Sequence, residues 1–282
     1  MPTATALTAL EQSVDDAIAA LRGRRFAVLS GAGISTDSGI PDYRGEGAPK
    51  SHPMTFSEFV HSEQHRRRYW MGSHLGWKRF AGAEPNVGHR ALARAEEHGH
   101  VSGIITQNVD ALHQKAGSLR VVDLHGRLDR VKCLGCGQSF SRHFIHTAID
   151  EANPWLHEMD IAGDIRPDGD VGIEVAADFR IPSCDVCGGV VKPEVVFFGE
   201  FVPPGVYAHA AATLARSEAL VVAGSSLVVN TGMRLVREAL GLKLPLVVIN
   251  RGPTKADRFA DVRIEGGTSE SLHALTEALL ES

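Results

Sequence analysis

The cysteines of this chain are the residues whose spacing most directly indicates a chemistry. There are only four, arranged as two Cys-x-x-Cys pairs, Cys133/Cys136 and Cys184/Cys187. Four thiolates suit a tetrahedral Zn²⁺ and leave no position for substrate or water, so the pattern predicts one structural zinc ion. Two disulfides are the alternative, but thiols in the cytosol are kept reduced and no export signal is visible. A redox dithiol would leave the second pair unexplained.

Polar or glycine-rich clusters follow most of the short apolar runs. These clusters are Gly31-Ala-Gly33, Gln107-Asn108-Val-Asp110, His125-Gly126, Gly199-Glu200, Gly224-Ser-Ser226 and Asn250-Arg-Gly252. Ligands of a parallel sheet bind beyond the carboxyl ends of its strands, so we expect the clusters to share one edge and form a site. Gly31 and Gly33 fit a dinucleotide phosphate at a helix N-terminus, although Thr36 stands where a third glycine is expected. This departure disfavours a hydride-transferring dehydrogenase.

The elements that must position these clusters alternate between strands and helices. Apolar runs predict strands at 26–30, 104–106, 121–124, 195–198, 219–223, 246–249 and 261–264. Short, continuously apolar strands are typical of a parallel sheet covered on both faces, and helical segments such as 208–218 and 232–240 lie between several of them. We therefore expect an α/β fold, a doubly wound parallel Rossmann-like sheet with a smaller domain made of a zinc-ribbon module and a helical insertion.

The composition disfavours several classes of protein. With 43% hydrophobic and 22% charged residues, the chain is not broadly disordered. Its net charge of −5 gives no overall attraction for nucleic acid or an anionic membrane. Residues 130–192 hold ten acidic and six basic side chains, which disfavours a zinc module that reads nucleic acid. No apolar run reaches the roughly 18 residues of a membrane span. The first 20 residues contain acids but no Lys or Arg, unlike a targeting signal, so we expect a cytoplasmic protein.

Taken as whole motifs, several of these clusters resemble the signature of the sirtuins. The matching blocks, in the order of that family, are Gly31-Ala-Gly-Ile-Ser-Thr-Asp-Ser-Gly-Ile-Pro-Asp-Tyr-Arg44, Thr106-Gln-Asn-Val-Asp-Ala-Leu-His113, Leu124-His-Gly126, the two cysteine pairs and Pro193-Glu-Val-Val-Phe-Phe-Gly-Glu200. The resemblance is closest to the class II sirtuins. It rests there on Tyr43, the Tyr69-Trp70 pair, the long segment between the cysteine pairs and Gly-Pro-Thr at 252–254.

The resemblance implies an enzyme that consumes NAD⁺ to remove acyl groups from lysine. In sirtuins the carbonyl oxygen of the acylated lysine attacks the nicotinamide ribose and expels nicotinamide, and the final products include free lysine and O-acyl-ADP-ribose. His125 is then the general base for the ribose hydroxyls, a role that suits imidazole because its unperturbed pKa lies near neutral pH. Asn108 would hold the ribose and an ordered water, and Asp110 would bind the nicotinamide amide.

The resemblance also assigns residues to the cofactor and to the substrate. Besides Asn108 and Asp110, the implied NAD contacts are Gly31, Ala32, Gly33, Ser35, Asp42, Tyr43, Arg44, Gln107, Gly224, Ser225, Ser226, Asn250, Arg251 and Gly252. An acylated protein or peptide would enter as an added strand, with Phe198, Gly199, Glu200, Leu227 and Val228 as its contacts. The implied Rossmann-like NAD-binding domain comprises 1–44, 101–129 and 193–282. A cofactor loop and helical module covers 45–100, and the zinc-binding module covers 130–192.

Two departures from the family pattern bear on the substrate. Many relatives have a proline near position 230, where this chain has Asn230. This difference affects the geometry of the substrate loop. The Tyr-x-x-Arg pair of the acid-selective branch is absent after Arg44, so we expect a neutral acyl group, acetyl or longer, rather than succinyl or malonyl. Two other functions stay open, namely protein mono-ADP-ribosyl transfer and a catalytically silent NAD- or ADP-ribose-binding sensor. The intact His125, Asn108 and Asp110 disfavour the sensor. The oligomeric state is not predicted.

Overall fold

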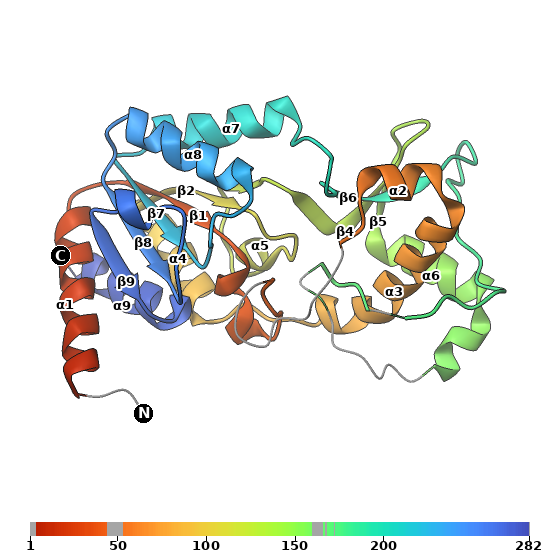
Figure 1. The fold of residues 1–282 in the computed structure, drawn as a ribbon, viewed down its shortest axis with the longest axis horizontal. Helices are drawn as coiled ribbons and strands as arrows, with labels where there is room; N and C mark the ends of the chain where they lie inside the picture. The colour runs from red at the N-terminus through yellow and green to blue at the C-terminus, as the bar shows by residue number, and fades with distance from the viewer. Residues whose placement is uncertain (1–3, 44–52, 160–165, 167, 172, 282) are drawn as a thin grey trace.

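The computed structural model describes residues 4–43, 53–159, 166, 168–171 and 173–281. Arg44, one of the implied NAD contacts, lies outside these residues. Figure 1 shows a larger part that contains both chain ends and a smaller part beside it. None of the helices within the described ranges is long and apolar enough to cross a membrane.

A six-stranded parallel sheet forms the larger part and confirms the predicted fold class. Its strands are β1 (Phe26–Ser30), β2 (Val101–Thr106), β3 (Val121–Asp123), β7 (Ala219–Ala223), β8 (Leu246–Asn250) and β9 (Val262–Glu265). They lie in the order β3-β2-β1-β7-β8-β9, and each neighbouring pair is parallel. The order reverses between β1 and β7. In doubly wound sheets ligands bind beyond the strand ends at such a point, which locates the expected site.

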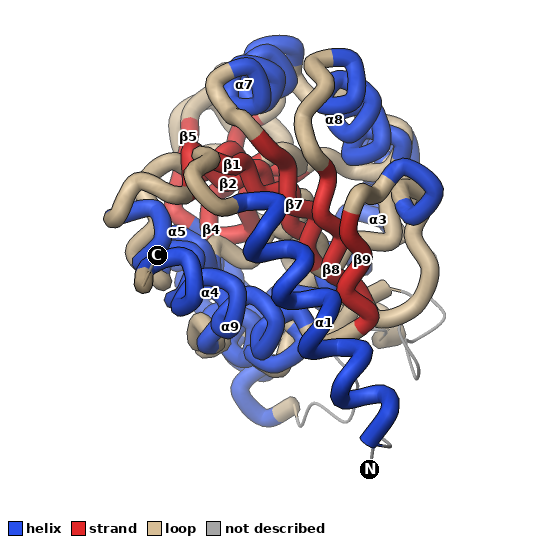
Figure 2. Tube along the Cα trace, turned by 90° about the vertical axis from the view of Figure 1, so that its left-hand side faces the viewer, coloured by secondary structure: helices blue, strands red, loops and turns tan. Residues whose placement is uncertain are grey.

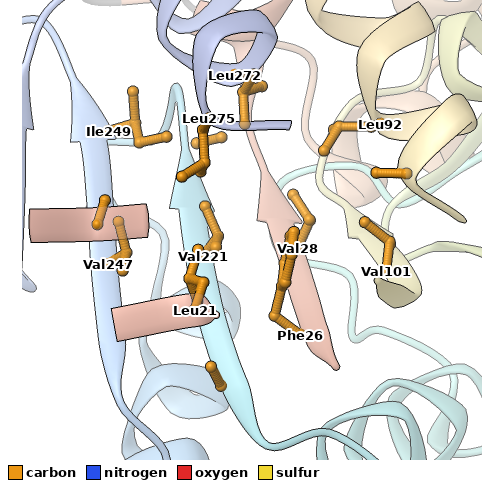
Figure 3. Packing of buried hydrophobic residues seen from close by; sticks show 14 of the residues in the cluster. Leu21, Phe26, Val28, Leu92, Val101, Val221, Val247, Ile249, Leu272 and Leu275 are labelled. Atoms are coloured by element: carbon orange, nitrogen blue, oxygen red, sulfur yellow. The ribbon is translucent and has the colours of Figure 1, made fainter. Parts of the chain in front are cut away.

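Helices cover both faces of this sheet (Figure 2). One face carries α1 (Ala4–Leu21), α4 (Val87–Glu97) and α9 (Thr268–Leu280), and the other carries α7 (Pro204–Ala215) and α8 (Asn230–Gly241). Because successive strand residues point to opposite faces, Val28 packs under the first set of helices and Leu29 under the second. Figure 3 shows Leu21, Leu272 and Leu275 over the strands of the first face. Burial on both faces explains why these strands are apolar without alternation.

The smaller part is built on a three-stranded antiparallel sheet in the order β5-β4-β6. Its strands are β4 (Gly126–Cys133), β5 (Ser139–Ser141) and β6 (Val191–Val195), and its helices are α2 (Phe56–His61), α3 (Glu63–Ala81), α6 (Arg142–Ala152) and the 3₁₀ helix η3 (Pro154–Glu158). Phe59, Trp70 and Ile149 come from three of these helices and share one buried core with Val131 of β4. The helical insertion and the cysteine segment therefore pack as one body.

Two elements lie elsewhere than the sequence pattern indicates. The prediction of a parallel strand over 195–198 is wrong, because the strand spans Val191–Val195 and pairs antiparallel with β4. It lies at the edge of the small sheet, where the missing N–H of Pro193 is tolerated. Helix α4, which the sequence grouped with the helical module, packs Leu92 and Ala95 against the large sheet instead.

Candidate active site

The loops after β1 and β7 meet through glycines at the switch point. The backbone N–H of Gly33 donates to the carbonyl of Gly224 at 2.9 Å, and that of Gly31 donates to Ala223 at 3.0 Å. Gly224 has a φ of 65°, and a Cβ added there would clash with the backbone nitrogen of Ile34. After Gly31 the chain continues as two 3₁₀ turns, η1 (Ala32–Ile34) and η2 (Thr36–Ser38), so the helix N-terminus suggested for this loop is a 3₁₀ turn.

A connected set of hydrogen bonds fixes Asn108 and Asp110. Ser35 Oγ donates to Asp110 Oδ2 at 2.7 Å, and the backbone N–H of Leu112 donates to Oδ1 at 2.9 Å. Asn108 Nδ2 donates to Ser35 Oγ and to the carbonyl of Gly31, both at 3.1 Å. Burial raises the pKa of Asp110, while the hydrogen bonds from Leu112 and Ser35 lower it. Loops after β1 and β2 are thus joined into one rigid wall.

His125 lies between β3 and β4, where the chain passes from the large sheet to the small one. Its Nδ1 is 3.0 Å from the carbonyl oxygen of Gln107. A carbonyl only accepts, so Nδ1 carries the proton and Nε2 keeps its lone pair. Burial lowers the pKa of His125, and the bond to Gln107 partly opposes this effect. The imidazole is therefore neutral at neutral pH and able to accept a proton through Nε2.

A cleft of about 250 Å³ between the two parts brings many of the implied site residues together. Those that line it are Ala32, Ser35, Tyr43, Gln107, Asn108, Asp110, His125, Phe198, Gly199 and Glu200. Apolar side chains complete the wall, namely Ile40, Met54, Val109, Leu128, Val195 and Phe197. Among the described residues the lining includes the acids Asp110, Asp168 and Glu200 but no Lys or Arg. This combination disfavours an anionic guest and favours one that is largely apolar.

The other implied NAD contacts do not line this cleft. They are Gly31, Gly33, Asp42, Gly224, Ser225, Ser226, Asn250, Arg251 and Gly252. Ser225 lies just behind it, because its Oγ accepts from Gln107 Nε2 at 2.8 Å. Asn250 closes the turn after β8, and its Nδ2 donates to the carbonyls of Arg251 and Gly252 at 2.8 and 2.9 Å. These residues extend the site along the carboxyl edge of the sheet, in the direction of β8.

The two segments implied in peptide binding reach the cleft unequally. Phe198 is half-exposed, and its carbonyl accepts from the backbone N–H of Phe56 at 2.9 Å. Leu227 is buried in the core at a φ of 55° and does not line the cleft. Val228 is exposed, and its carbonyl accepts from Lys255 Nζ at 3.0 Å. Val229, the next residue, does line the cleft.

Lys192 is a candidate functional residue that no sequence motif indicates. Its Nζ lies 2.9 Å from Glu200 Oε2 and 4.5 Å from the ring centroid of Phe197. The same carboxylate oxygen accepts from the backbone N–H of Phe197 at 2.8 Å. Burial lowers the pKa of Lys192, and Glu200 raises it. A lysine two residues before the acidic residue of the Val191-Lys-Pro-Glu-Val195 segment is a weak signal for this group, which holds Glu200 at the cleft.

The four cysteines converge and are not disulfide-bonded. The Sγ atoms of Cys133 and Cys187 are 3.5 Å apart, and those of Cys136 and Cys184 are 3.7 Å apart. A disulfide would need about 2.05 Å, whereas thiolates around a tetrahedral Zn²⁺ with Zn–S bonds of about 2.3 Å lie about 3.8 Å apart. Backbone N–H groups of Cys136 and Gly135 lower the pKa of the Cys133 thiol to about 6. The cluster therefore fits the predicted structural zinc ion.

Comparison with known proteins now decides the family. A sequence model of the Sir2 family matches residues 31–231, which include the β1 loop, His125 and all four cysteines. The chain belongs to the Sir2 family. The NAD-dependent protein deacetylase 1 of Mycobacterium avium is 47% identical to it over 93% of this chain and 94% of that protein. The NAD-dependent protein deacylase Sirt4 of Drosophila melanogaster is 47% identical over 84% of this chain and 78% of that protein.

Solved structures extend the likeness to the whole Sir2 fold. A Sir2 structure bound to a propionylated peptide has a TM-score of 0.75 at 28% identity and covers 94% of this chain and 97% of its own. A Sir2 complex with a p53 peptide and NAD⁺ has a TM-score of 0.75 at 29% identity and covers 97% and 99%. The sirtuin expectation is thus confirmed, whereas the class II assignment stays a prediction.

Proposed function

We propose that this Sir2 family protein is an NAD-dependent protein-lysine deacylase that removes a neutral acyl group, acetyl or longer, and forms nicotinamide and O-acyl-ADP-ribose. The observation that carries the proposal is the neutral His125 at the cleft, with its proton held on Nδ1 by Gln107. The relatives named as NAD-dependent deacetylase and deacylase support the reaction. Peptides in the solved Sir2 structures support a protein or peptide substrate.

We assign the chemical roles as follows from the contacts in the cleft. When bound, NAD⁺ supplies a ribose carbon from which nicotinamide leaves. With NAD⁺ and the acylated lysine bound, His125 Nε2 would accept the proton of a ribose hydroxyl. Asp110 is held by Ser35 and Leu112, and in this position it binds the nicotinamide amide. Asn108 holds the ribose and an ordered water. The phosphates would lie beside the loops after β1 and β7, where glycines allow a close approach.

The lining of the cleft supports a neutral acyl group. An acyl chain that ends in a carboxylate would lie near Asp110, Asp168 and Glu200, with no Lys or Arg among the described lining residues to offset its charge. Burying such an unpaired charge is costly. Apolar side chains such as Val109 and Phe197 would instead contact an acetyl or longer hydrocarbon chain.

We also propose the division of the chain and its location. The NAD-binding domain comprises 1–44, 101–129 and 193–282, and the packing of α4 supports adding this helix to it. The zinc-binding module at 130–192 and the helices before α4 then form the smaller domain. A cytoplasmic location and the absence of nucleic-acid partners stay predictions.

A panel of acyl-lysine peptides incubated with NAD⁺ tests the reaction. We expect mass spectrometry to show deacylated peptide together with O-acyl-ADP-ribose, with acetyl or longer neutral chains above succinyl and malonyl. His125→Ala should lose at least about 100-fold in rate, as expected for a general base, whereas His143→Ala, on the exposed side of α6, should match wild type. Label from radioactive NAD⁺ that stays on protein would favour ADP-ribosyl transfer. Absence of turnover with every peptide would favour the catalytically silent NAD- or ADP-ribose-binding sensor.

A further inference from the structure

A second group of metal-ligating side chains lies in the smaller part, on residues other than the cysteines. His74 comes from α3, His146 and Asp150 come from α6, and His157 comes from η3. His146 and Asp150 are four residues apart on α6, so they project from the same face of the helix. The His74 side chain is only 4% exposed, whereas His157 is largely exposed. The group is thus open to solvent on one side.

Three imidazoles surround the single carboxylate. His74 Nε2 lies 3.0 Å from Asp150 Oδ1, His146 Nε2 lies 3.7 Å from Oδ2, and His157 Nε2 lies 4.0 Å from Oδ1. The rings of His74 and His146 stack at 4.0 Å between centroids, and ligand atoms from His74, His146 and Asp150 all lie within 4.8 Å of one another. Only the 3.0 Å contact is a hydrogen bond.

The separations of 3.7 and 4.0 Å between Asp150 and the imidazoles of His146 and His157 are too long for hydrogen bonds. They are closer to the spacing of ligand atoms around a metal ion. Ligand atoms bound to a tetrahedral metal at about 2.0 to 2.1 Å are about 3.4 Å apart, so a small closure of His74, His146 and Asp150 would place them around one ion, and the exposed His157 would have to move farther to join them. A hydrogen-bonded His74–Asp150 pair alone would not require His146 and His157 to direct Nε2 at the same carboxylate.

The protonation of the imidazoles suits metal binding. Burial, together with the neighbouring His146, lowers the pKa of His74 to about 4, and burial also lowers the pKa of His146. Both rings are therefore neutral at pH 7 and lose no proton on binding. In the empty site His74 Nε2 donates its proton to Asp150, and because neither Nδ1 has a hydrogen-bond partner within the described part of the chain, nothing bound at Nδ1 prevents the proton from moving there when an ion takes Nε2. The buried guanidinium of Arg142 opposes a cation here, and Asp150 offsets it.

We propose that His74, His146 and Asp150, with His157 as the fourth ligand, bind a divalent transition-metal ion of the Zn²⁺ type. Three imidazole nitrogens and one carboxylate oxygen form a donor set of borderline softness, which suits Zn²⁺, Co²⁺ or Ni²⁺ rather than Mg²⁺ or Ca²⁺. Such an ion joins α3 to α6 and η3, and α3 also carries Tyr69, which lines the cleft. The site would therefore stabilise the wall of the smaller part that faces the substrate.

Zinc stoichiometry of the whole protein tests the proposal. After incubation with excess Zn²⁺ and buffer exchange, elemental analysis should find about two zinc ions per chain in wild type, and about one, in the cysteines, in His146→Ala and in Asp150→Asn. His143→Ala removes an exposed histidine from the same helix and should keep two. The cysteine-bound zinc that remains in each variant, together with its circular dichroism, shows that the variant is folded.

Co²⁺ added to the zinc-loaded protein provides an independent readout. Binding to nitrogen and oxygen ligands should give d–d absorption without the thiolate charge-transfer bands of a cysteine site. His157→Ala, which alters an exposed residue, should weaken this binding about 10-fold or more. One zinc per chain in wild type, or two in His146→Ala, would overturn the proposal.

Discussion

One backbone carbonyl decides which nitrogen of His125 can act. Because Gln107 accepts from Nδ1, the lone pair is confined to Nε2, and a backbone contact on the other nitrogen of the ring sets the direction of proton transfer. The Leu124-His-Gly126 motif indicates the residue, but not the tautomer. That depends on the loop after β2, which lies 18 residues earlier in the sequence and meets His125 only in the fold.

The lowered pKa of His125 predicts how activity depends on pH. The base must be neutral, and burial lowers its pKa from the usual 6.5, so the acidic limb of kcat/KM should be centred below pH 6.5. A profile of kcat/KM for NAD⁺ between pH 4.5 and about 8.5 measures this. An acidic limb centred above 6.5 would contradict the assignment. Asp110, whose pKa is raised by burial, also titrates on the acidic side, and Asp110→Asn separates its contribution.

Sequence motifs identify residues that lie in the cleft better than residues that support them. Ser35, Asn108, Asp110 and His125 all come from recognisable blocks and all line the cleft. Lys192, which fixes Glu200, belongs to no block with an assigned role, because its importance arises from an ion pair formed on folding. Such partners depend on which strands become neighbours, and a single sequence does not contain that information.

At the scale of elements, the glycines between the loops after β1 and β7 make the close approach possible. Gly224→Ala should destabilise the protein by about 2 kcal/mol or more and weaken NAD⁺ binding, because its φ is 65° and a Cβ would clash with Ile34. Gly205→Ala on α7 is the matched control, since nothing lies within 4 Å of its added Cβ. Urea unfolding compares the two variants. Equal stability of Gly224→Ala and wild type would show that the loops separate without cost.

The strands of the large sheet could be predicted because they are buried on both faces. Runs such as 219–223 and 246–249 are continuously apolar, which is the pattern typical of a parallel strand covered on both faces. The same reasoning misplaced residues 195–198, because an apolar run reports burial and does not report the sheet that provides it. The pairing of β6 with β4 joins segments that are about 60 residues apart, and the turn glycines beside them, such as Gly137 and Gly188, do not indicate which strands pair.

For the whole molecule, the four cysteines tie the two ends of a long insertion to the small sheet. Cys184→Ser should remove zinc and lower Tm by roughly 5 to 15 °C, since the loss of a structural ion costs several kcal/mol. Ser183→Ala changes the exposed neighbouring residue and should leave Tm and metal content unchanged. Scanning calorimetry and zinc analysis measure both quantities. Unchanged Tm together with no zinc in wild type would refute a structural metal.

Buried neutral histidines predict how the stability of the whole protein depends on pH. Burial lowers the pKa of His74 and His89 to about 4 and also lowers that of His113 well below its usual value. In the unfolded chain they titrate near 6.5, so below that pH the unfolded state binds more protons and the free energy of unfolding falls, down to about pH 4.

His89 isolates this effect, because it is fully buried and, within the described part of the chain, neither of its ring nitrogens has a hydrogen-bond partner. His89→Leu should therefore lose less stability than wild type between pH 7 and pH 5, by on the order of 2 kcal/mol in urea unfolding. His61→Gln changes an exposed histidine and should follow wild type at both pH values. An identical loss in His89→Leu and wild type would mean that His89 takes up its proton equally well in the folded and the unfolded chain, and the acid sensitivity would then have to come from other groups such as His74 and His113.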